Sequence, residues 1–262
     1  MPGNAALPPG TADNRRLPYD RPMHLLALDT STDTLSIAVQ HGAQVLEHQG
    51  AGGAQSSPTL IPAIRALMQQ AGLGFDALDA VVFGRGPGSF TGLRTACAVA
   101  QGLAFAARGG QGVPVLPVDT LLAVAEQARV QHGCTQVLAV LDARMDEVYN
   151  AAFEWRADTS PAGGHWRAPA DFGLCAPEAV AAPPGWTVAG NAQAAYGARL
   201  APGAPHVHAL PTAAALLRLA PALLAQGAAV PADQALPRYV RDKVAQTTAE
   251  RAAARRDAAA QP

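Results

Sequence analysis

The chain has 262 residues, of which 49% are apolar and 15% charged, and its formal net charge is −1. This size and composition predict a globular protein of one large or two small domains and exclude an intrinsically disordered chain. The near-neutral balance argues against a protein that binds nucleic acid alone by neutralising phosphates. Cys97, Cys134 and Cys175 are odd in number and widely spaced, which indicates reduced thiols rather than a disulfide framework.

The first residues do not show the pattern of a signal peptide. Residues 1–22 are rich in Pro, Gly, Asn and Asp and lack the apolar segment of a signal peptide, so we predict a disordered leader. Met1 and Met23 are alternative start sites. The longest apolar run, residues 213–230, is interrupted by an arginine and a proline and is too broken to span a membrane. We therefore expect a cytoplasmic protein.

The first half of the chain alternates between strand and helix patterns. Strands are predicted over residues 24–28, 35–40, 44–48, 80–83 and 113–118. A helix over residues 59–71 places Leu60, Ile64 and Leu67 on one apolar face. Pro62 is compatible with that helix only if the helix begins near Thr59. Pro62 would then lie in the first turn, where the backbone needs no N–H donor.

The stretch over residues 80–108 combines a strand, a glycine-proline loop and a long helix. Pro87-Gly88 suits a type II turn, and Ser89 stands at the N-cap position of the helix. The loop lacks the last glycine of a GxGxxG fingerprint and the lysine of a Walker A loop. We interpret it as a structural turn rather than a phosphate site.

The helix after this loop has a seam of small residues. Gly92, Ala96, Ala100 and Ala104 fall every fourth residue, so another backbone could approach closely along this line. Most of the remaining surface is apolar, which predicts burial on more than one side. One side can be covered by the chain's own sheet, and the other side needs another element or another chain.

The second half echoes the first. Strands are predicted over residues 137–141, 147–155 and 187–190, and helices over residues 120–129 and 212–226. Because the strands over 24–28 and 137–141 both end on Asp, we predict a weak internal repeat within an α/β fold with parallel strands. Residues 157–184 are interpreted as an irregular excursion. Residues 227–262 are predicted to form a basic tail with a capping-box pattern at 247–250. We expect this tail to be solvated, with assisted nucleic-acid contact as the lesser alternative.

Two aspartates at strand ends are the candidate chemistry. Asp29 and Asp142 could face each other and hold a magnesium nucleotide, with Thr30 and Ser31 as further candidate contacts. Equally, each Asp could simply cap a turn. The histidines form no recognised ligand motif, so no metal site is predicted.

Four segments together resemble the TsaB (YeaZ) family of tRNA threonylcarbamoyladenosine (t6A) biosynthesis proteins. They read LLALDTSTDTLSIAV, GRGPGSFTGLRTACAVAQGLA, VLAVLDARMDEVY and PRYVRDKVA, and the GRGPGSFTGLR block is the most specific. The resemblance implies an actin/sugar-kinase/Hsp70-like (ASKHA) fold of two related lobes. The first lobe would comprise residues 23–118 with the helix over 212–226, and the second residues 119–211.

The same resemblance implies an accessory role. The catalytic relative TsaD carries a metal-binding His-x-x-x-His pair, and the corresponding positions here are Thr120 and Val124. Neither can hold iron or zinc as a histidine would. We therefore expect a pseudo-enzyme with no catalytic residues of its own. The rival hypothesis from another class is an autonomous ATP-dependent kinase that uses Asp29 and Asp142.

The family resemblance also implies partners. TsaD is expected as the heterodimer partner and TsaE as a recruited ATPase, with a functional link to TsaC; the chain alone would form a homodimer. Contact with tRNA is expected only through the complex. No tightly bound cofactor is expected, although ATP or ADP with Mg could lie at the complex interface. The expected interface residues lie on the two first-lobe helices and the loop between strand and helix: Leu60, Ile64, Leu67, Gly86, Pro87, Gly88, Ser89, Phe90, Thr91, Gly92, Arg94, Ala96 and Ala100.

Overall fold

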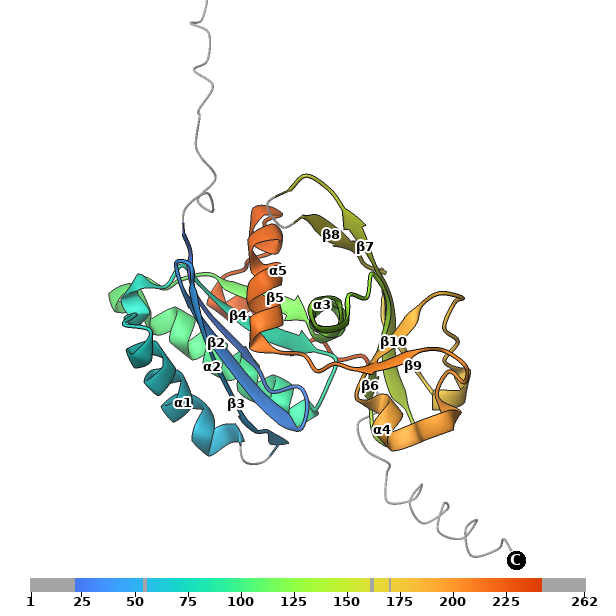
Figure 1. Cartoon of the computed structure of the whole chain (residues 1–262). Coiled ribbons are helices and arrows are strands. Elements are labelled where there is room, and N and C mark those ends of the chain that lie inside the picture. The colour runs from blue at the N-terminus through green and yellow to red at the C-terminus, as the bar shows by residue number, and fades with distance from the viewer. Residues whose placement is uncertain (1–21, 54–55, 161–162, 170, 242–262) are drawn as a thin grey trace, which may run out of the picture.

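The computed structural model describes residues 22–53, 56–160, 163–169 and 171–241, and it contains two β-sheets with helices packed on and between them (Figure 1). Apart from residue 22, the expected leader lies outside the described residues, as does the capping-box pattern at 247–250. Among the described residues, no helix combines the length and the apolar character needed to cross a membrane.

The first sheet has the strand order β3-β2-β1-β4-β5. Its strands are β1 (His24–Asp29), β2 (Thr34–His41), β3 (Gln44–Ala51), β4 (Ala80–Gly86) and β5 (Val115–Asp119). β1, β2 and β3 pair antiparallel, whereas β1, β4 and β5 run parallel. The predicted strands of the first half are thus confirmed within a few residues at their ends.

The second sheet repeats this plan. Its strands are β6 (Gln136–Asp142), β7 (Val148–Ala157), β8 (Gly164–Arg167), β9 (Gly173–Cys175), β10 (Thr187–Gly190) and β11 (His206–His208). The order β11-β10-β6-β7-β8 follows the order of the first sheet, with β6, β7 and β8 antiparallel and β6, β10 and β11 parallel. The two sheets therefore share both strand order and strand direction.

The expectation of an irregular excursion over residues 157–184 was wrong in part. Both β8 and β9 lie in it and pair with β7. Trp166 of β8 packs edge-on against Trp155 of β7, with ring centroids 5.3 Å apart. Strands of four and three residues among Pro, Ala and Gly are too short to show an alternating pattern. The cross-strand aromatic pair helps to hold β8, and β9 is held by its pairing with residues 148–150 of β7.

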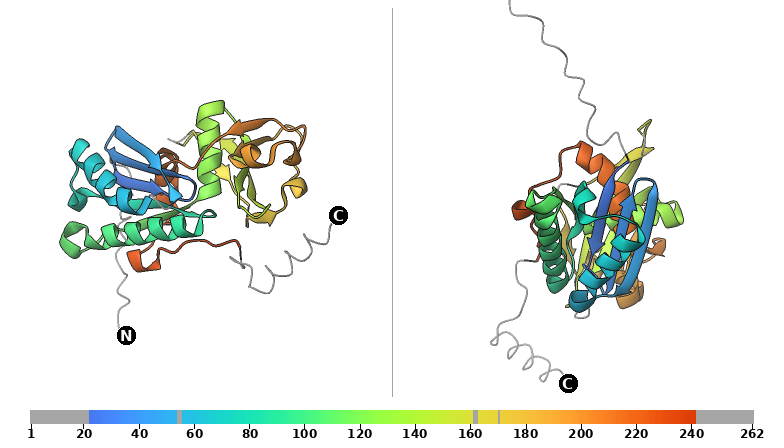
Figure 2. Two further views of the ribbon diagram at one scale, coloured as in Figure 1. Left: turned by 90° about the horizontal axis from the view of Figure 1, so that it is seen from below. Right: turned by 90° about the vertical axis from the view of Figure 1, so that its left-hand side faces the viewer.

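The described residues also form five α-helices: α1 (Ser56–Gln70), α2 (Phe90–Ala106), α3 (Thr120–His132), α4 (Ala192–Tyr196) and α5 (Ala213–Ala225). Side chains alternate along β1, so Leu26 and Leu28 face α1 and α2, whereas Leu25 and Ala27 face α3 and α5. As Figures 1 and 2 show, α1 and α2 cover the side of the first sheet that faces away from the second, and α3 lies between the sheets.

The start of α1 differs from the prediction. The helix begins at Ser56 rather than near Thr59, so Pro62 stands in its second turn. Proline there removes the N–H that would donate to the carbonyl of Pro58, one turn earlier. The apolar face of α1 packs so fully on the first sheet that burial outweighs this lost bond, since Leu60 and Ile64 are completely buried.

The glycine-proline loop also differs from the predicted type II turn. β4 extends to Gly86, and the peptide bond between Gly86 and Pro87 is cis. The positive φ falls on Gly86 (φ 117°), not on Gly88. The N-cap prediction is confirmed, because Ser89 Oγ accepts a hydrogen bond from the N–H of Gly92.

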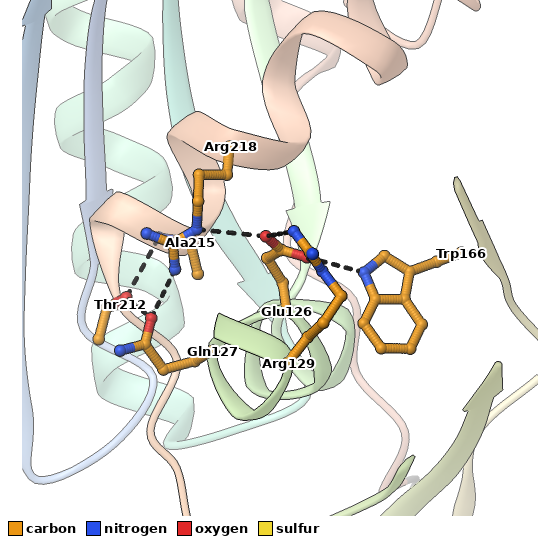
Figure 3. Close-up of polar contacts among 7 residues, drawn as sticks. All are labelled: Glu126, Gln127, Arg129, Trp166, Thr212, Ala215 and Arg218. Atoms are coloured by element: carbon orange, nitrogen blue, oxygen red, sulfur yellow. Dashed lines mark hydrogen bonds and ion pairs between the residues drawn. The ribbon is translucent and has the colours of Figure 1, made fainter. Parts of the chain in front are cut away.

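A buried carboxylate ties α3 to both sheets (Figure 3). Glu126 of α3 accepts hydrogen bonds from Arg129 (2.9 and 3.0 Å), from Arg218 of α5 (3.2 Å) and from the indole N–H of Trp166 on β8 (2.9 Å). The charge and both carboxylate oxygens are thereby satisfied, as a buried acid requires. Because α5 packs on the first sheet and β8 belongs to the second, this cluster helps to fix the sheets relative to each other.

The small-residue seam of α2 is used within the chain. Gly92, Ala96, Ala100 and Ala104 are all buried, and the alanines lie in the core formed with β1 and β4. A Cβ atom on Gly92 would stand 1.8 Å from the carbonyl oxygen of Thr30. The expectation that a sister protein covers this seam was therefore wrong: the chain's own sheet covers it.

Gly92→Ala is expected to destabilise the protein by about 1–3 kcal/mol, because the added methyl group must push α2 away from the backbone after β1. Gly102→Ala is the matched control: nothing lies within 4 Å of its added Cβ, so it should be neutral or stabilise the helix by about 0.5–1 kcal/mol. Urea unfolding followed by circular dichroism measures both. Equal effects of the two variants would contradict the close approach of α2.

Candidate functional site

A cleft of about 430 Å³ lies where β1 and β6 end. Residues 31–33 and 87–90 line it from the first sheet, and residues 141–145 line it from the second. Residues 238–241 of the C-terminal segment complete the wall. The topology explains this position, because β1 and β6 occupy equivalent central places in their sheets and both end at the cleft.

Asp29 lies beneath the cleft rather than in its wall. Its side chain is fully buried, and Oδ1 accepts hydrogen bonds from the N–H (2.9 Å) and the hydroxyl (2.6 Å) of Ser31. Within the described part of the chain, Oδ2 has no hydrogen-bond partner. Burial raises the pKa of Asp29 to about 6, against the opposing effect of the two bonds from Ser31.

Asp142 does line the cleft. Its Oδ1 accepts from the N–H of Arg144 and from the hydroxyl of Tyr196, both at 2.8 Å, and its Oδ2 lies 3.2 Å from the Arg144 guanidinium. Asp29 and Asp142 thus each accept the N–H two residues ahead, the Asx-turn geometry of a turn cap. Both aspartates therefore cap turns, as one of the two alternatives predicts, and nucleotide binding stays a prediction.

Thr30 and Ser31, the other two residues predicted to contact a nucleotide, differ in their position relative to the cleft. Ser31 is buried but lines the cleft, whereas Thr30 is outside the cleft lining and its hydroxyl donates a hydrogen bond to the carbonyl of Gly92 (2.6 Å). Among the described residues, no three His, Cys, Asp or Glu side chains gather where they could hold a metal ion. Thr120 and Val124 are both buried in α3.

Three arginines at the cleft were not identified from the sequence as site residues. Arg144 of the loop after β6 pairs with Asp33 after β1 (2.8 Å), so it bridges the two sheets. Arg238 and Arg241 of the basic tail also line the cleft and are ion-paired. The expectation of a solvated tail was wrong for Arg238 and Arg241, because both fold back onto acidic groups that lie far away in the sequence.

The predicted interface residues fall into three groups. Six are buried inside the chain and cannot contact a partner: Leu60, Ile64, Leu67, Gly92, Ala96 and Ala100. Five lie at the cleft loop: Gly86, Pro87, Gly88, Ser89 and Phe90. Two are exposed on the first turns of α2, namely Thr91 and Arg94. Because Ala100 is 0% exposed, Ala100→Arg would disrupt the core, so it is unsuitable as an interface probe.

The exposed face of the same two helices was missed. Ile61 of α1 is 48% exposed and Phe105 of α2 is 73% exposed, and Ala98 and Gly102 of α2 are also exposed. We call these four residues the outer face. In the sequence, the exposed residues of α2 form a second apolar stripe along the helix. Periodicity alone cannot distinguish this stripe from the stripe that faces the core.

The pKa of Asp29 predicts a specific pH dependence of stability. Since the folded state holds this proton more tightly than the unfolded state, the contribution of Asp29 to stability is fully present below pH 3.8 and is lost as the pH rises through about 6. Asp29→Asn removes this titrating group, so the variant does not lose stability in this way. The difference in unfolding free energy between Asp29→Asn and wild type should therefore rise by roughly 2 kcal/mol between pH 4 and pH 7.

Chemical unfolding across this pH range measures the difference. Ser31→Ala is the companion variant: it deletes a hydrogen bond that lowers the pKa of Asp29, so the transition should move to higher pH. Parallel stability profiles of wild type and Asp29→Asn would show that Asp29 does not titrate in this way.

Comparison with known proteins shows which family the chain resembles. Over residues 43–249 the chain matches the family described as "TsaD: tRNA N6-adenosine threonylcarbamoyltransferase". It is 32% identical to "tRNA threonylcarbamoyladenosine biosynthesis protein TsaB" of Escherichia coli, over 85% of this chain and 96% of the relative. The Haemophilus influenzae protein of the same name is 38% identical over 59% of this chain and 64% of the relative, just under two thirds of its length.

A solved structure shows the same fold. "YeaZ from Pseudomonas aeruginosa" superposes with a TM-score of 0.74 at 39% identity, over 83% of this chain and all of that one. The two-sheet α/β architecture is consistent with the expected ASKHA fold. The chain belongs to the TsaB (YeaZ) family of tRNA threonylcarbamoyladenosine biosynthesis proteins.

Proposed function

We propose that the chain is the non-catalytic partner subunit of a cytoplasmic t6A-modification complex, in which it pairs with TsaD. In this role it supports threonylcarbamoyl transfer to the adenosine beside the tRNA anticodon. The observation that carries the proposal is the outer face on α1 and α2, which leaves apolar side chains of Ile61 and Phe105 in water. Ile61 and Phe105 lie on two helices that pack against each other, so one partner surface could cover both.

The composition of α2 supports docking of another helix on this face. Ala98 and Gly102 lie one turn apart on its exposed side, and their small size lets a facing helix come near. Phe105, one turn further, offers the large side chain that such contacts use as an anchor. We propose that TsaD covers this face and that a second copy of the chain covers it when TsaD is absent.

A scaffold role also accounts for the candidate aspartates. Asp29 is inaccessible beneath the cleft, and Asp142 is engaged by Arg144 and Tyr196. We interpret the matching strand orders as two related lobes of an ASKHA protein that has given up its own catalysis. TsaE, TsaC and tRNA would then act through the complex, and any ATP or ADP with Mg would bind where this chain meets its partner.

The alternative is an autonomous ATP-dependent kinase with Asp142 at the nucleotide. Under the scaffold proposal Asp142→Asn should leave tRNA modification by the reconstituted complex within about twofold of wild type, because Asn keeps an acceptor oxygen for Arg144 and Tyr196. A kinase would lose tenfold or more of its activity on losing this carboxylate. Metal-dependent phosphoryl transfer by the purified chain, abolished by Asp142→Asn, would establish the alternative.

Ala98→Arg tests the outer face. It places a long charged side chain at an exposed position of α2, so complex formation with TsaD should weaken at least tenfold while the melting temperature of the chain stays unchanged. Val130→Arg is the matched control, since Val130 is an exposed apolar residue on another helix, α3. Size-exclusion chromatography of mixtures measures both; co-elution of Ala98→Arg with TsaD at wild-type affinity would refute this interface.

A further inference from the structure

The C-terminal segment of residues 235–241, here called the strap, runs from α2 across the cleft to the second sheet. It begins at Ala235, which is fully buried. The carbonyl of Ala235 accepts hydrogen bonds from Gln101 Nε2 (2.9 Å) and from Cys97 Sγ (3.0 Å) of α2. This end of the strap is therefore fixed to the first sheet's helix.

The middle of the strap contacts both sheets. The N–H of Arg238 donates to the carbonyl of Arg85 at 2.7 Å, which holds the backbone at the end of β4. Its guanidinium lies 3.5 Å from Asp119 of β5 and 3.0 Å from Asp171, and it stacks 4.0 Å from the ring centre of Phe172. Because Asp171 and Phe172 come directly before β9, Arg238 spans the gap between the sheets.

The Arg241 side chain attaches the far end of the strap to the second sheet. Arg241 lies 2.5 Å from Glu147, just before β7, and also donates to the carbonyl of Arg144 (3.3 Å). The side chains of Arg241 and Glu147 are 13% and 38% exposed, whereas those of Arg238 and Asp171 are 28% and 87% exposed. Since exposed pairs contribute little, the Arg241–Glu147 pair is the stronger attachment to the second sheet.

The loop between β6 and β7, which contains Glu147, has an uncommon backbone conformation. Arg144, Met145 and Asp146 all have left-handed backbone, with φ of 61°, 56° and 59°. Residues other than glycine seldom adopt it, and such backbone is found where a surrounding structure enforces it for a function. Here Arg199 holds Asp146 with two hydrogen bonds of 2.7 and 2.8 Å, and the loop presents Glu147 to the strap.

We propose that the strap is a latch that closes the cleft between the two sheets and that releases from the second sheet at the Arg241–Glu147 pair. The strap has no strand partner within the described residues, so side-chain contacts rather than a β-ladder hold its far end. Such segments open at low free-energy cost while the core remains folded. Access to the buried part of the cleft wall at Ala143 then requires the latch to open. The latch needs no partner subunit, so its test uses the chain alone and is independent of TsaD binding.

The test introduces a thiol into the cleft wall by Ala143→Cys. Ala143 lines the cleft and is 7% exposed, so the introduced thiol should react slowly with a maleimide while the latch is closed. Adding Arg241→Gln removes the charge that Glu147 binds, and the labelling rate at position 143 should rise about tenfold. Peptide mass spectrometry separates this thiol from Cys97, Cys134 and Cys175.

Two further variants keep the test decisive. Glu147→Gln breaks the same pair from the other side and should give the same increase, so misfolding of one variant does not end the test. Arg156→Gln is the matched control, because it removes an exposed ion pair with Glu154 within β7 and should leave the rate unchanged. Unchanged labelling in both latch variants would overturn the proposal, and so would an equal increase at Cys134, which would indicate general loosening.

Discussion

The close approach of α2 to the end of β1 is the constraint on which the rest of the structure depends. The hydroxyl of Thr30 donates to the carbonyl of Gly92 at 2.6 Å, and no side chain fits between the two backbones there. The alanines that follow keep the helix at this short distance along the sheet. This contact places Ser89 and the loop before it at the cleft, and it turns the opposite side of α2 outward.

The two functional surfaces follow from that packing. The outer face carries Phe105 and Ile61 into solvent, so it is where we propose that a partner binds. The cleft collects charged side chains from three directions, yet they are engaged with one another: Arg144 with Asp33, and Arg241 with Glu147. A protein that uses its cleft charges to hold its sheets together is better suited to present a surface than to bind and turn over a substrate, which agrees with the scaffold role.

Local pattern predicted most of the fold, since the two-residue and 3.6-residue periods place strands and helices correctly. It also located Ser89 as N-cap and Asp142 at the cleft. It failed where distant parts of the chain decide the outcome. Periodicity showed that α2 has two apolar sides but not that its own sheet would cover the Gly92–Ala104 seam. Likewise, no local signal reveals that Arg241 pairs with a glutamate 94 positions earlier, or that Trp166 anchors a four-residue strand on β7.

The central claim is that the side of α2 turned away from the sheet, and not its small-residue seam, meets the partner subunit. Hydroxyl-radical footprinting of the chain alone and mixed with TsaD tests this directly, because it reports the solvent access of individual side chains. We expect Phe105 and Ile61 to lose reactivity on mixing, while the exposed Val130 of α3 stays reactive. Phe105 and Ile61 remaining as reactive in the complex as in the free chain would contradict the account.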